Sequence, residues 1–578
     1  MYLRETKRRN RDGSVVSYLA LAHNERDPES GTPRARILYN FGRADRVDRA
    51  ALERLVDSIG RFLGHESASE QADAGSGELP PVVDSRAMGA SWVADQLWQR
   101  LGISTAIGEA VAGGRVDAEL VERVVFAMVA NRLSGEPLSK RAGTRWVAER
   151  VFIPGLEAMS EDDCYRAMDR FLEVIGEVQR RVFFSVANLL NLQVDLVFFD
   201  STSTYWETDT ADQPDPREEL DPREDERATD GDEAGEAVEA AVRTWGRSKD
   251  HRPDLPQVVI GMAVTREGIP VRVWTFPGDA SDQTLLRTVK DDLRDWQLGR
   301  VVWVLDRGFT SEQNRRYLQR AGGGYIMGEK LRGASSEAAA ALSRQGRYRT
   351  VAGNLRVKEV RVDDGAARDR FIVCHNPEAA ERDAAVRAAI VARLEAAIEG
   401  SDQLPAAERA ELAGALRTKP GYNRFLRTTP KGYLRVDRAA VRRDAHYDGK
   451  YLLRTSDESL SAGDIAEGYK ALYEAERGWR DLKTGIDLRP VFHHKPQRIQ
   501  AHVQLCWLAL LLMRVAEHAT SDTWRNLRHE LDRLHLVTMA TREGHLAQRS
   551  ELTPGQRDIL AALELPTPPR VLDVAATK

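Results

Sequence analysis

Residues 469–483 read YKALYEAERGWRDLK, and the interpretation of the whole chain starts from this stretch. Apolar residues recur in and around it at steps of three, four and seven, which predicts an amphipathic helix with one buried stripe. This stripe consists of Ile465, Leu472, Ala475, Trp479, Leu482 and Ile486. The neighbouring polar stripe consists of Tyr469, Tyr473, Glu476, Arg480 and Lys483. The predicted helix therefore holds a carboxylate one turn before a guanidinium and two turns before an ammonium.

This polar stripe has two interpretations. In the first, it is a solvated helix surface on which Glu476 pairs with Arg480 and Lys483. In the second, Glu476 is a metal-binding carboxylate that works on phosphate, and the cations beside it hold that phosphate. Two aspartates at the ends of strands upstream favour the second interpretation.

Those aspartates follow two apolar strands. Residues 194–199 read VDLVFF and lead into Asp200, and residues 300–305 read RVVWVL and lead into Asp306. An aspartate in such a place often does no more than cap a turn. Together with Glu476, however, the two aspartates would supply the oxygen ligands that suit Mg²⁺. Two such ions can activate an attacking oxygen and stabilise a leaving one, provided that the fold brings the three carboxylates together.

The elements around the aspartates predict a mixed α/β sheet. Two strands, at 258–264 and 270–276, flank a turn at Gly268 and form a hairpin. Helices at 281–296 and 311–321 and a strand at 324–330 complete the pattern. After residue 330 this rhythm stops, and short β-like pieces surround a helical segment at 378–417, which indicates an insertion.

The composition predicts the following division of the chain. A small β-rich module at 1–65 is followed by a linker at 66–83 and a helical region at 84–190. The α/β core has a first part at 191–330 and a second part at 456–520, separated by an insertion domain at 331–455. A helical C-terminal tail at 521–578 ends the chain. The linker is rich in Ser, Gly, Glu and Pro, as linkers commonly are.

The charge is distributed unevenly. The chain of 578 residues has a formal net charge of −5, which by itself argues against a nucleic-acid partner. Residues 207–239, however, hold 15 acidic and 3 basic residues, and the other 81 basic and 74 acidic residues leave the rest of the chain at +7. The acidic segment has few apolar residues, so we expect a disordered loop at 207–240. Outside this loop, the charge allows nucleic-acid binding.

Two basic segments are candidates for such binding. Residues 131–141 form a turn that ends in Lys140 and Arg141, between apolar helical patterns. Helices joined by basic turns can dock on DNA phosphates, although the same arrangement builds many helical domains of other function. The second segment, residues 246–257, is extended and contains Lys249 and Arg252.

Several other classes are disfavoured. The three cysteines are far apart and show no metal-ligand spacing, which predicts a reduced, cytoplasmic protein without structural zinc. The N-terminal residues have no apolar segment after their charges, so we do not expect a signal peptide. The longest apolar run, Leu505–Met513, is too short to span a bilayer and predicts a buried helix, so no membrane partner is expected. No phosphate-binding glycine loop is present, so no nucleotide cofactor is expected.

The sequence around Asp200, Asp306 and Glu476 resembles the DDE transposases of bacterial insertion sequences. The late helix is similar to the YREK signature of one group of these enzymes, written Y-(2)-R-(3)-E-(6)-K. Tyr469, Glu476 and Lys483 match the signature in type and spacing. Leu472 stands at the arginine position, so this sequence departs from the pattern there, and Arg477 or Arg480 could supply the charge instead.

The resemblance implies a fold, a reaction and a site. The fold is a ribonuclease-H-like α/β core, interrupted by a β-rich insertion between Asp306 and Glu476. The reaction is cut-and-paste transposition, in which water hydrolyses a phosphodiester at the element's end and the freed 3′-hydroxyl attacks target DNA. The three carboxylates would be both catalytic and metal-binding, and would hold two Mg²⁺ ions, for which Mn²⁺ can substitute.

The resemblance also implies partners. These are double-stranded DNA at the element ends and at the target, and a second copy of the chain, in a nucleoid-associated bacterial protein. The residues expected to contact DNA are Tyr469, Arg477, Arg480, Lys483, Lys249, Arg252, Arg307, Lys140 and Arg141. Two alternatives remain open: a ribonuclease-H-like nuclease that does not join DNA ends, and a catalytically silent DNA-binding protein derived from a transposase.

Overall fold

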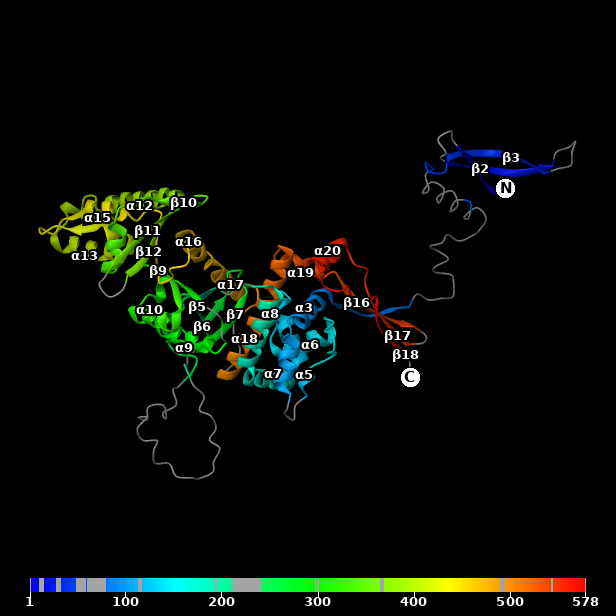
Figure 1. Cartoon of the computed structure of the whole chain (residues 1–578), viewed down its shortest axis with the longest axis horizontal. Coiled ribbons are helices and arrows are strands. Elements are labelled where there is room, and N and C mark those ends of the chain that lie inside the picture. Colours follow the sequence, from blue (N-terminus) through cyan, green and yellow to red (C-terminus); the bar gives the residue numbers. More distant parts are fainter. Residues whose placement is uncertain are drawn as a thin grey trace, which may run out of the picture. The chain divides into compact units, whose positions relative to one another are not determined.

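The computed structural model describes residues 2–9, 15–26, 33–47, 59, 80–112, 117–192, 195–208, 211–212, 241–296, 298, 301–363, 368–488, 493, 495–541 and 544–576. Figure 1 shows the chain from end to end. Most of the expected linker, and almost all of the acidic loop expected at 207–240, lie outside the described residues.

The chain forms two compact units. The first comprises residues 1–83, 539–546 and 575–578, and the second comprises residues 84–538 and 547–574. In the described part of the first unit, β1 (Tyr2–Arg9), β2 (Val15–Arg26) and β3 (Pro33–Arg43) form an antiparallel sheet in the order β1-β2-β3. All side chains of β1 are exposed.

A large mixed sheet forms the centre of the second unit. In the described residues it has nine strands in the order β10-β11-β12-β15-β9-β8-β5-β6-β7. They are β5 (Leu196–Tyr205), β6 (Gln257–Val264), β7 (Pro270–Pro277), β8 (Val302–Leu305), β9 (Gly324–Glu329), β10 (Arg349–Ala352), β11 (Leu355–Asp363), β12 (Arg368–His375) and β15 (Lys450–Thr455). The pairs β5–β8 and β8–β9 are parallel, and the other pairs are antiparallel. The predicted mixed α/β sheet is confirmed.

The central strands are apolar on both sides because helices cover both faces of the sheet. One face carries Val197 and Phe199 and packs against α8 (Ile175–Leu189), α9 (Asp282–Arg294) and α10 (Glu312–Gln319). The opposite face carries Leu196 and Phe198. There, α16 (Ala462–Lys470) packs on β8 and β9, and α17 (Tyr473–Thr484) packs on β5 and β6.

Helix α18 (Pro496–Thr520) is the core helix of this unit. It contacts β7 on one side and the helical region on another, and nearly all of its middle is buried (Figure 1). Its length and mean hydropathy of 1.4 would suit a membrane span, but 94% of that window is buried inside the protein. The buried helix predicted from its apolar run is therefore confirmed. The other helices of the region are α3 (Gly89–Arg100), α4 (Ile103–Val111), α5 (Ala118–Leu133), α6 (Lys140–Glu149) and α7 (Glu161–Glu173).

The segment between β9 and α16 contributes to two structures. Strands β10, β11, β12 and β15 continue the central sheet beyond β9. The other elements are α11 (Ser336–Ser343), α12 (Pro377–Ile398), α13 (Ala406–Arg417), α14 (Pro420–Phe425), β13 (Leu426–Thr428), β14 (Leu434–Val436) and α15 (Arg438–Ala445). Helices α12 to α15 form a separate apolar core around Leu394 and Phe425. The strands extend the sheet because an unpaired β9 would leave backbone groups without partners.

The C-terminal segment differs from the expected helical tail at 521–578. It contains α19 (Trp524–Leu531) and α20 (Pro554–Ala562), but also β16 (His535–Thr541), β17 (Gly544–Arg549) and β18 (Val571–Ala576). With β4 (Val82–Ala87), the described residues form a four-stranded sheet in the order β18-β17-β16-β4. The expectation of helix alone is wrong because these short strands are stabilised by pairing with one another and with a strand far away in the sequence.

Candidate active site

Asp200 and Asp306 lie side by side on neighbouring parallel strands. In the register of β5 and β8, Phe199 pairs with Leu305, so each aspartate follows its pair directly. Adjacent strands are typically about 4.8 Å apart. Because side chains alternate along a strand, Asp200 shares the face of Phe198, which is the face that α17 covers. The two predicted aspartates are thus brought together.

The electrostatics of Asp200 indicate crowded carboxylates. Burial raises the pKa of Asp200 to about 6, and the nearby Asp306 and Asp282 act in the same direction. Lys249 and a hydrogen bond from the backbone of Ser201 act in the opposite direction, but do not cancel the rise in pKa.

Lys249 is bound to the strand that carries Asp200. Its ammonium donates to the Ser201 carbonyl oxygen at 2.7 Å and to Ser201 Oγ at 2.8 Å, and it lies 3.5 Å from Asp282 Oδ1. Ser201 Oγ itself donates to Asp282 Oδ1. The cation predicted to contact DNA therefore also bridges β5 and the start of α9 beside the aspartates.

Tyr469 connects α16 to Asp306. Its hydroxyl donates to Asp306 Oδ1 at 3.0 Å, and its ring stacks on Tyr451 with centroids 6.1 Å apart. Burial, followed by the charge of Asp306, raises the pKa of Tyr469, so the hydroxyl keeps its proton and acts as a donor. This contact requires glycine at 328, because a Cβ there would lie 2.2 Å from the Tyr469 hydroxyl oxygen.

Glu476 lies on the exposed side of α17. The opposite side of this helix is buried through Ala475, Trp479 and Leu482, and Gly478 allows close packing on Met262 of β6. The charge of Glu476 contributes to the raised pKa of Tyr469, which places it on the Tyr469 side of the site. Within the described residues, however, no three carboxylate, histidine or cysteine side chains are close enough to hold a metal ion. The carboxylate oxygens fit Mg²⁺ chemically, but the three groups are not gathered around one point.

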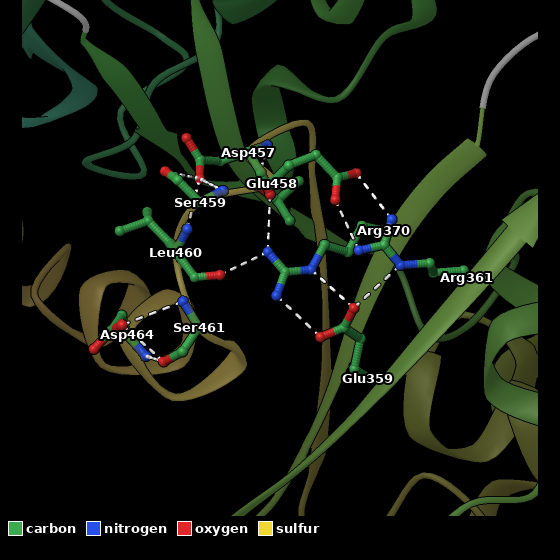
Figure 2. A network of polar contacts seen from close by, with 10 residues as sticks. Glu359, Arg361, Arg370, Asp457, Glu458, Ser459, Leu460, Ser461 and Asp464 are labelled. Carbon is green, nitrogen blue, oxygen red and sulfur yellow. Dashed lines mark hydrogen bonds and ion pairs between the residues drawn. The ribbon is translucent and has the colours of Figure 1, made fainter.

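A network of polar contacts fixes the start of α16 (Figure 2). The buried Arg370 of β12 donates to the carbonyl oxygens of Asp457 at 2.9 Å and Leu460 at 2.7 Å, and pairs with Glu359 of β11 at 2.9 Å. Ser461 then caps the helix in a box with Asp464. The strands that extend the sheet thus hold the helix that carries Tyr469.

Two cavities lie on either side of Asp306 and Arg307, and both residues line both cavities. The first, of about 450 Å³, reaches from Tyr469 to α12 and α15 of the insertion. The second, of about 900 Å³, reaches from Lys249 to the turn before α9. Further basic side chains line these walls: Arg332, Arg387, Arg424 and Lys450 in the first cavity, and Arg247, His251 and Lys330 in the second.

Two of the predicted DNA-contacting side chains, Arg480 and Arg307, are exposed near this site, and a third, Arg252, is partly exposed. Arg480 donates to the Tyr473 hydroxyl at 3.1 Å and lies over its ring. Arg252 pairs with Asp254 at 2.9 Å and lies over the Tyr205 ring. Arg307 is exposed beside Asp306.

Two other predicted contacts on α17 are held by acids of the protein. Lys483 donates to Asp250 Oδ1 at 2.9 Å and to the Ser203 carbonyl oxygen at 3.0 Å. Arg477 pairs with Glu517 of α18 at 2.7 Å. The first interpretation of the polar stripe paired Lys483 with Glu476, whereas the structure gives Lys483 partners on β5 and on the 246–257 segment. This is because α17 packs across that part of the sheet.

Lys140 and Arg141 lie in different surroundings. Arg141 is exposed, but Lys140 is only 7% exposed, in the first turn of α6. The sequence interpretation placed Lys140 at the end of a basic turn, whereas the structure makes it the first residue of α6 and buries its side chain. Sequence reasoning also missed Asp282 and Asp250. Asp282 follows a helix cap and Asp250 stands in a basic segment, so no sequence pattern distinguishes them from ordinary surface acids.

The chain matches a family of DNA-processing enzymes. A sequence model described as "Transposase DDE domain" matches residues 196–512, more than half of the chain, so the protein belongs to the DDE transposases and is a DNA transposase. A second match, "IS1634 family transposase, N-terminal domain", covers residues 3–72.

A piggyBac transposase synaptic complex with hairpin DNA is 8% identical to the chain, covers 77% of it and 79% of its own length, and has a TM-score of 0.34. No curated protein matches the chain.

Proposed function

We propose that the protein performs metal-dependent cut-and-paste transposition of its insertion sequence, with Asp200, Asp306 and Glu476 as its catalytic carboxylates. The observation that carries this proposal is the pair of aspartates at adjacent strand ends, with Tyr469 of α16 bonded to one of them. The order β7-β6-β5-β8-β9, with an antiparallel meander on one side of β5 and two parallel strands on the other, supports a ribonuclease-H-like core.

The chemistry of the site supports a divalent metal. Asp200 is raised in pKa beside two other carboxylates, an arrangement that a cation would stabilise. We assign Asp200, Asp306 and Glu476 as the ligands of two Mg²⁺ ions, for which Mn²⁺ can substitute. When bound, such ions supply a nucleophilic oxygen and stabilise the leaving one. Because the three carboxylates are not gathered around one point, we expect metal binding to be accompanied by a movement of the Glu476 side chain or of α17.

The surrounding residues orient the acids and the DNA. Tyr469 donates to one oxygen of Asp306 and so leaves its other oxygen for a ligand. Lys249 and Lys483 donate to the carbonyl oxygens of Ser201 and Ser203, just after Asp200, and so hold this part of β5 against α9 and α17. The exposed Arg307 and Arg480 and the partly exposed Arg252 would contact the DNA backbone, with a strand passing along the two cavities at Asp306. Arg477 belongs to this set only if it leaves Glu517.

The wider assembly follows from the same function. We propose a homodimer on paired element ends, in a nucleoid-associated cytoplasmic protein, with the domain division given by the sequence. The helical region at 84–190 would then help to hold DNA, and the insertion at 331–455 would form one wall of the site.

The test is an assay of purified protein with a duplex that carries the DNA flanking its coding region. Cleavage at the element end with Mg²⁺ or Mn²⁺, and recovery of joined target products, would support the proposal. Cleavage without joining would instead support the nuclease alternative. Binding with no cleavage in either metal would support the catalytically silent alternative.

A further inference from the structure

A small cavity lies in the helical region, apart from the carboxylates. It has a volume of about 170 Å³, far more than one water molecule needs. It is formed by α5, α6, α7 and the start of α18. Its walls include Arg132, Lys140, Tyr165, His493 and His502.

Lys140 is buried in this cavity without an acidic partner. It is 7% exposed, and within the described residues no carboxylate forms an ion pair or hydrogen bond with its ammonium. The charged or titratable groups that act on it are Arg132, Cys506 and Cys164, and burial with Arg132 lowers the pKa of Lys140 to about 7. A buried ammonium beside a guanidinium is unfavourable unless an anion joins them.

Arg132 is a second buried cation that forms no ion pair with a carboxylate within the described residues. It is 6% exposed, and its hydrogen bonds go to the carbonyl oxygens of Leu138 and Asp487 and to the side chain of Asn131, with its Nε left without a partner. His502 is buried in the same wall, and burial, Lys140 and Arg132 lower its pKa well below its usual value. The ring is therefore neutral and does not neutralise either cation.

Two acids also line the cavity, and neither pairs with Lys140. Glu161 is exposed and accepts from the Tyr165 hydroxyl at 3.4 Å. The carboxylate of Asp487 acts on Arg132 and Cys506, but not on Lys140. The buried wall is thus positive and the exposed rim is mixed. The N-terminal end of α6, which favours an anion, is in the same place.

We propose that this cavity binds one phosphate group, held by Lys140 and Arg132. A tetrahedral phosphate suits it because ammonium and guanidinium donors meet there from two different helices. The source can be a backbone phosphate of bound DNA, in which case the inference rests on the proposed function, or free phosphate. The cavity is too small for a base pair, so DNA would place a single backbone phosphate there while Arg141 contacts a neighbour.

The first experiment titrates the full-length protein with inorganic phosphate by calorimetry, at constant ionic strength maintained with chloride. We expect one phosphate per chain, and at least tenfold weaker binding by Lys140→Met. The matched control is Arg145→Met, which changes an exposed arginine of the same helix outside the cavity and should bind phosphate like the parent. Equal binding by the parent and Lys140→Met, or no binding by the parent, would overturn the proposal.

The second experiment separates the two sources of phosphate. Affinity for a duplex is measured against salt for the parent and Lys140→Met, with thermal melting in chloride alongside. A loss of about one unit in the salt slope indicates a DNA backbone phosphate. An unchanged slope together with weakened binding of inorganic phosphate indicates free phosphate, which also supports the site.

Melting of Lys140→Met and cleavage by Asp306→Ala are control measurements for the phosphate experiments. Lys140→Met should melt no lower than the parent in chloride, because methionine removes an uncompensated charge. A large loss of melting temperature would assign the lysine a structural role and overturn the proposal. Asp306→Ala should lose cleavage but keep phosphate binding, so a failure of the carboxylate assignment and a failure of this cavity give different results.

Discussion

Lys483 and Lys140 are both largely buried lysines that the sequence predicts as DNA contacts, yet their surroundings are opposite. The Lys483 side chain is 13% exposed and pairs with Asp250, itself 15% exposed. Lys140 has a guanidinium and two thiols near it, and no paired carboxylate within the described residues. A buried ammonium that has a carboxylate is compensated, and removing either partner destabilises the fold. One that lacks a carboxylate lowers stability until an anion arrives. The partner therefore distinguishes a structural clamp from a binding site.

The largest effect is expected on the cleavage rate, from changes at the catalytic carboxylates. Asp306→Ala removes the acid that Tyr469 orients, and should reduce cleavage at least about a thousandfold, or roughly 4 kcal/mol in the activation barrier. DNA affinity should change little. The measurement is cleavage of an end-containing duplex with Mg²⁺, with binding by the same preparation as control. Full cleavage by this variant would show that the catalytic group lies elsewhere.

The next effect is on stability. Lys483→Met leaves Asp250 and the Ser203 carbonyl oxygen without their donor, and should destabilise the protein by about 2–4 kcal/mol. The double variant Lys483→Met with Asp250→Ala should recover part of this loss. Chemical denaturation of the parent, of Lys483→Met and Asp250→Ala singly, and of the double variant measures the coupling. If Lys483→Met melts like the parent, the lysine is not a clamp and the comparison with Lys140 fails.

Lys140→Met should instead increase the stability of the fold in phosphate-free buffer. Burial lowers the pKa of Lys140 in the folded protein to about 7, from its ordinary value of 10.5. Between these values the unfolded chain binds more protons, so the parent gains stability as pH rises from about 7 to about 10, by up to roughly 4 kcal/mol. The advantage of the variant should be largest at or below pH 7 and shrink above it.

Melting of both proteins at pH 6 and pH 9 tests this sign. The titratable groups around Lys140 do not obscure this pH dependence. Burial keeps His502 neutral and raises the pKa of Cys164 and of Cys506 to about 11. A gap between the two proteins that is constant with pH would mean that Lys140 finds a partner.

The sequence predicts the two strand-end aspartates and the mixed sheet because both depend on local patterns. Apolar runs that end in aspartate define β5 and β8, and parallel neighbours then place Asp200 beside Asp306. The amphipathic period likewise predicts the buried side of α17. The transposase family follows from these same residues, and its model matches the same part of the chain.

Long-range pairing is what the sequence does not contain. Asp250 is 233 positions from Lys483, and no local pattern selects it as a partner. The extension of the sheet by β15 and the strands at the C-terminus also depend on distant edges. The burial of Lys140, in contrast, could have been predicted from a local sequence pattern. It shares a helical face with Gly143 and Val147, both buried, so the period of α6 already placed it inside.

The smallest effect is expected at Arg480, which is exposed and whose guanidinium donates, within the described residues, to the Tyr473 hydroxyl. Arg480→Ala should change stability by less than about 0.5 kcal/mol. If the guanidinium holds a backbone phosphate, its removal should reduce the salt slope of DNA binding by about one unit. Arg477→Ala is the matched control three positions earlier on α17. That arginine pairs with the buried Glu517, so the variant should melt lower while its salt slope stays like the parent's. Affinity for an end-containing duplex between low and physiological salt, with melting of each variant, separates these outcomes. If both variants show the same slope as the parent, α17 contributes no phosphate contact at Arg480, and its role is confined to carrying Glu476 and packing on the sheet.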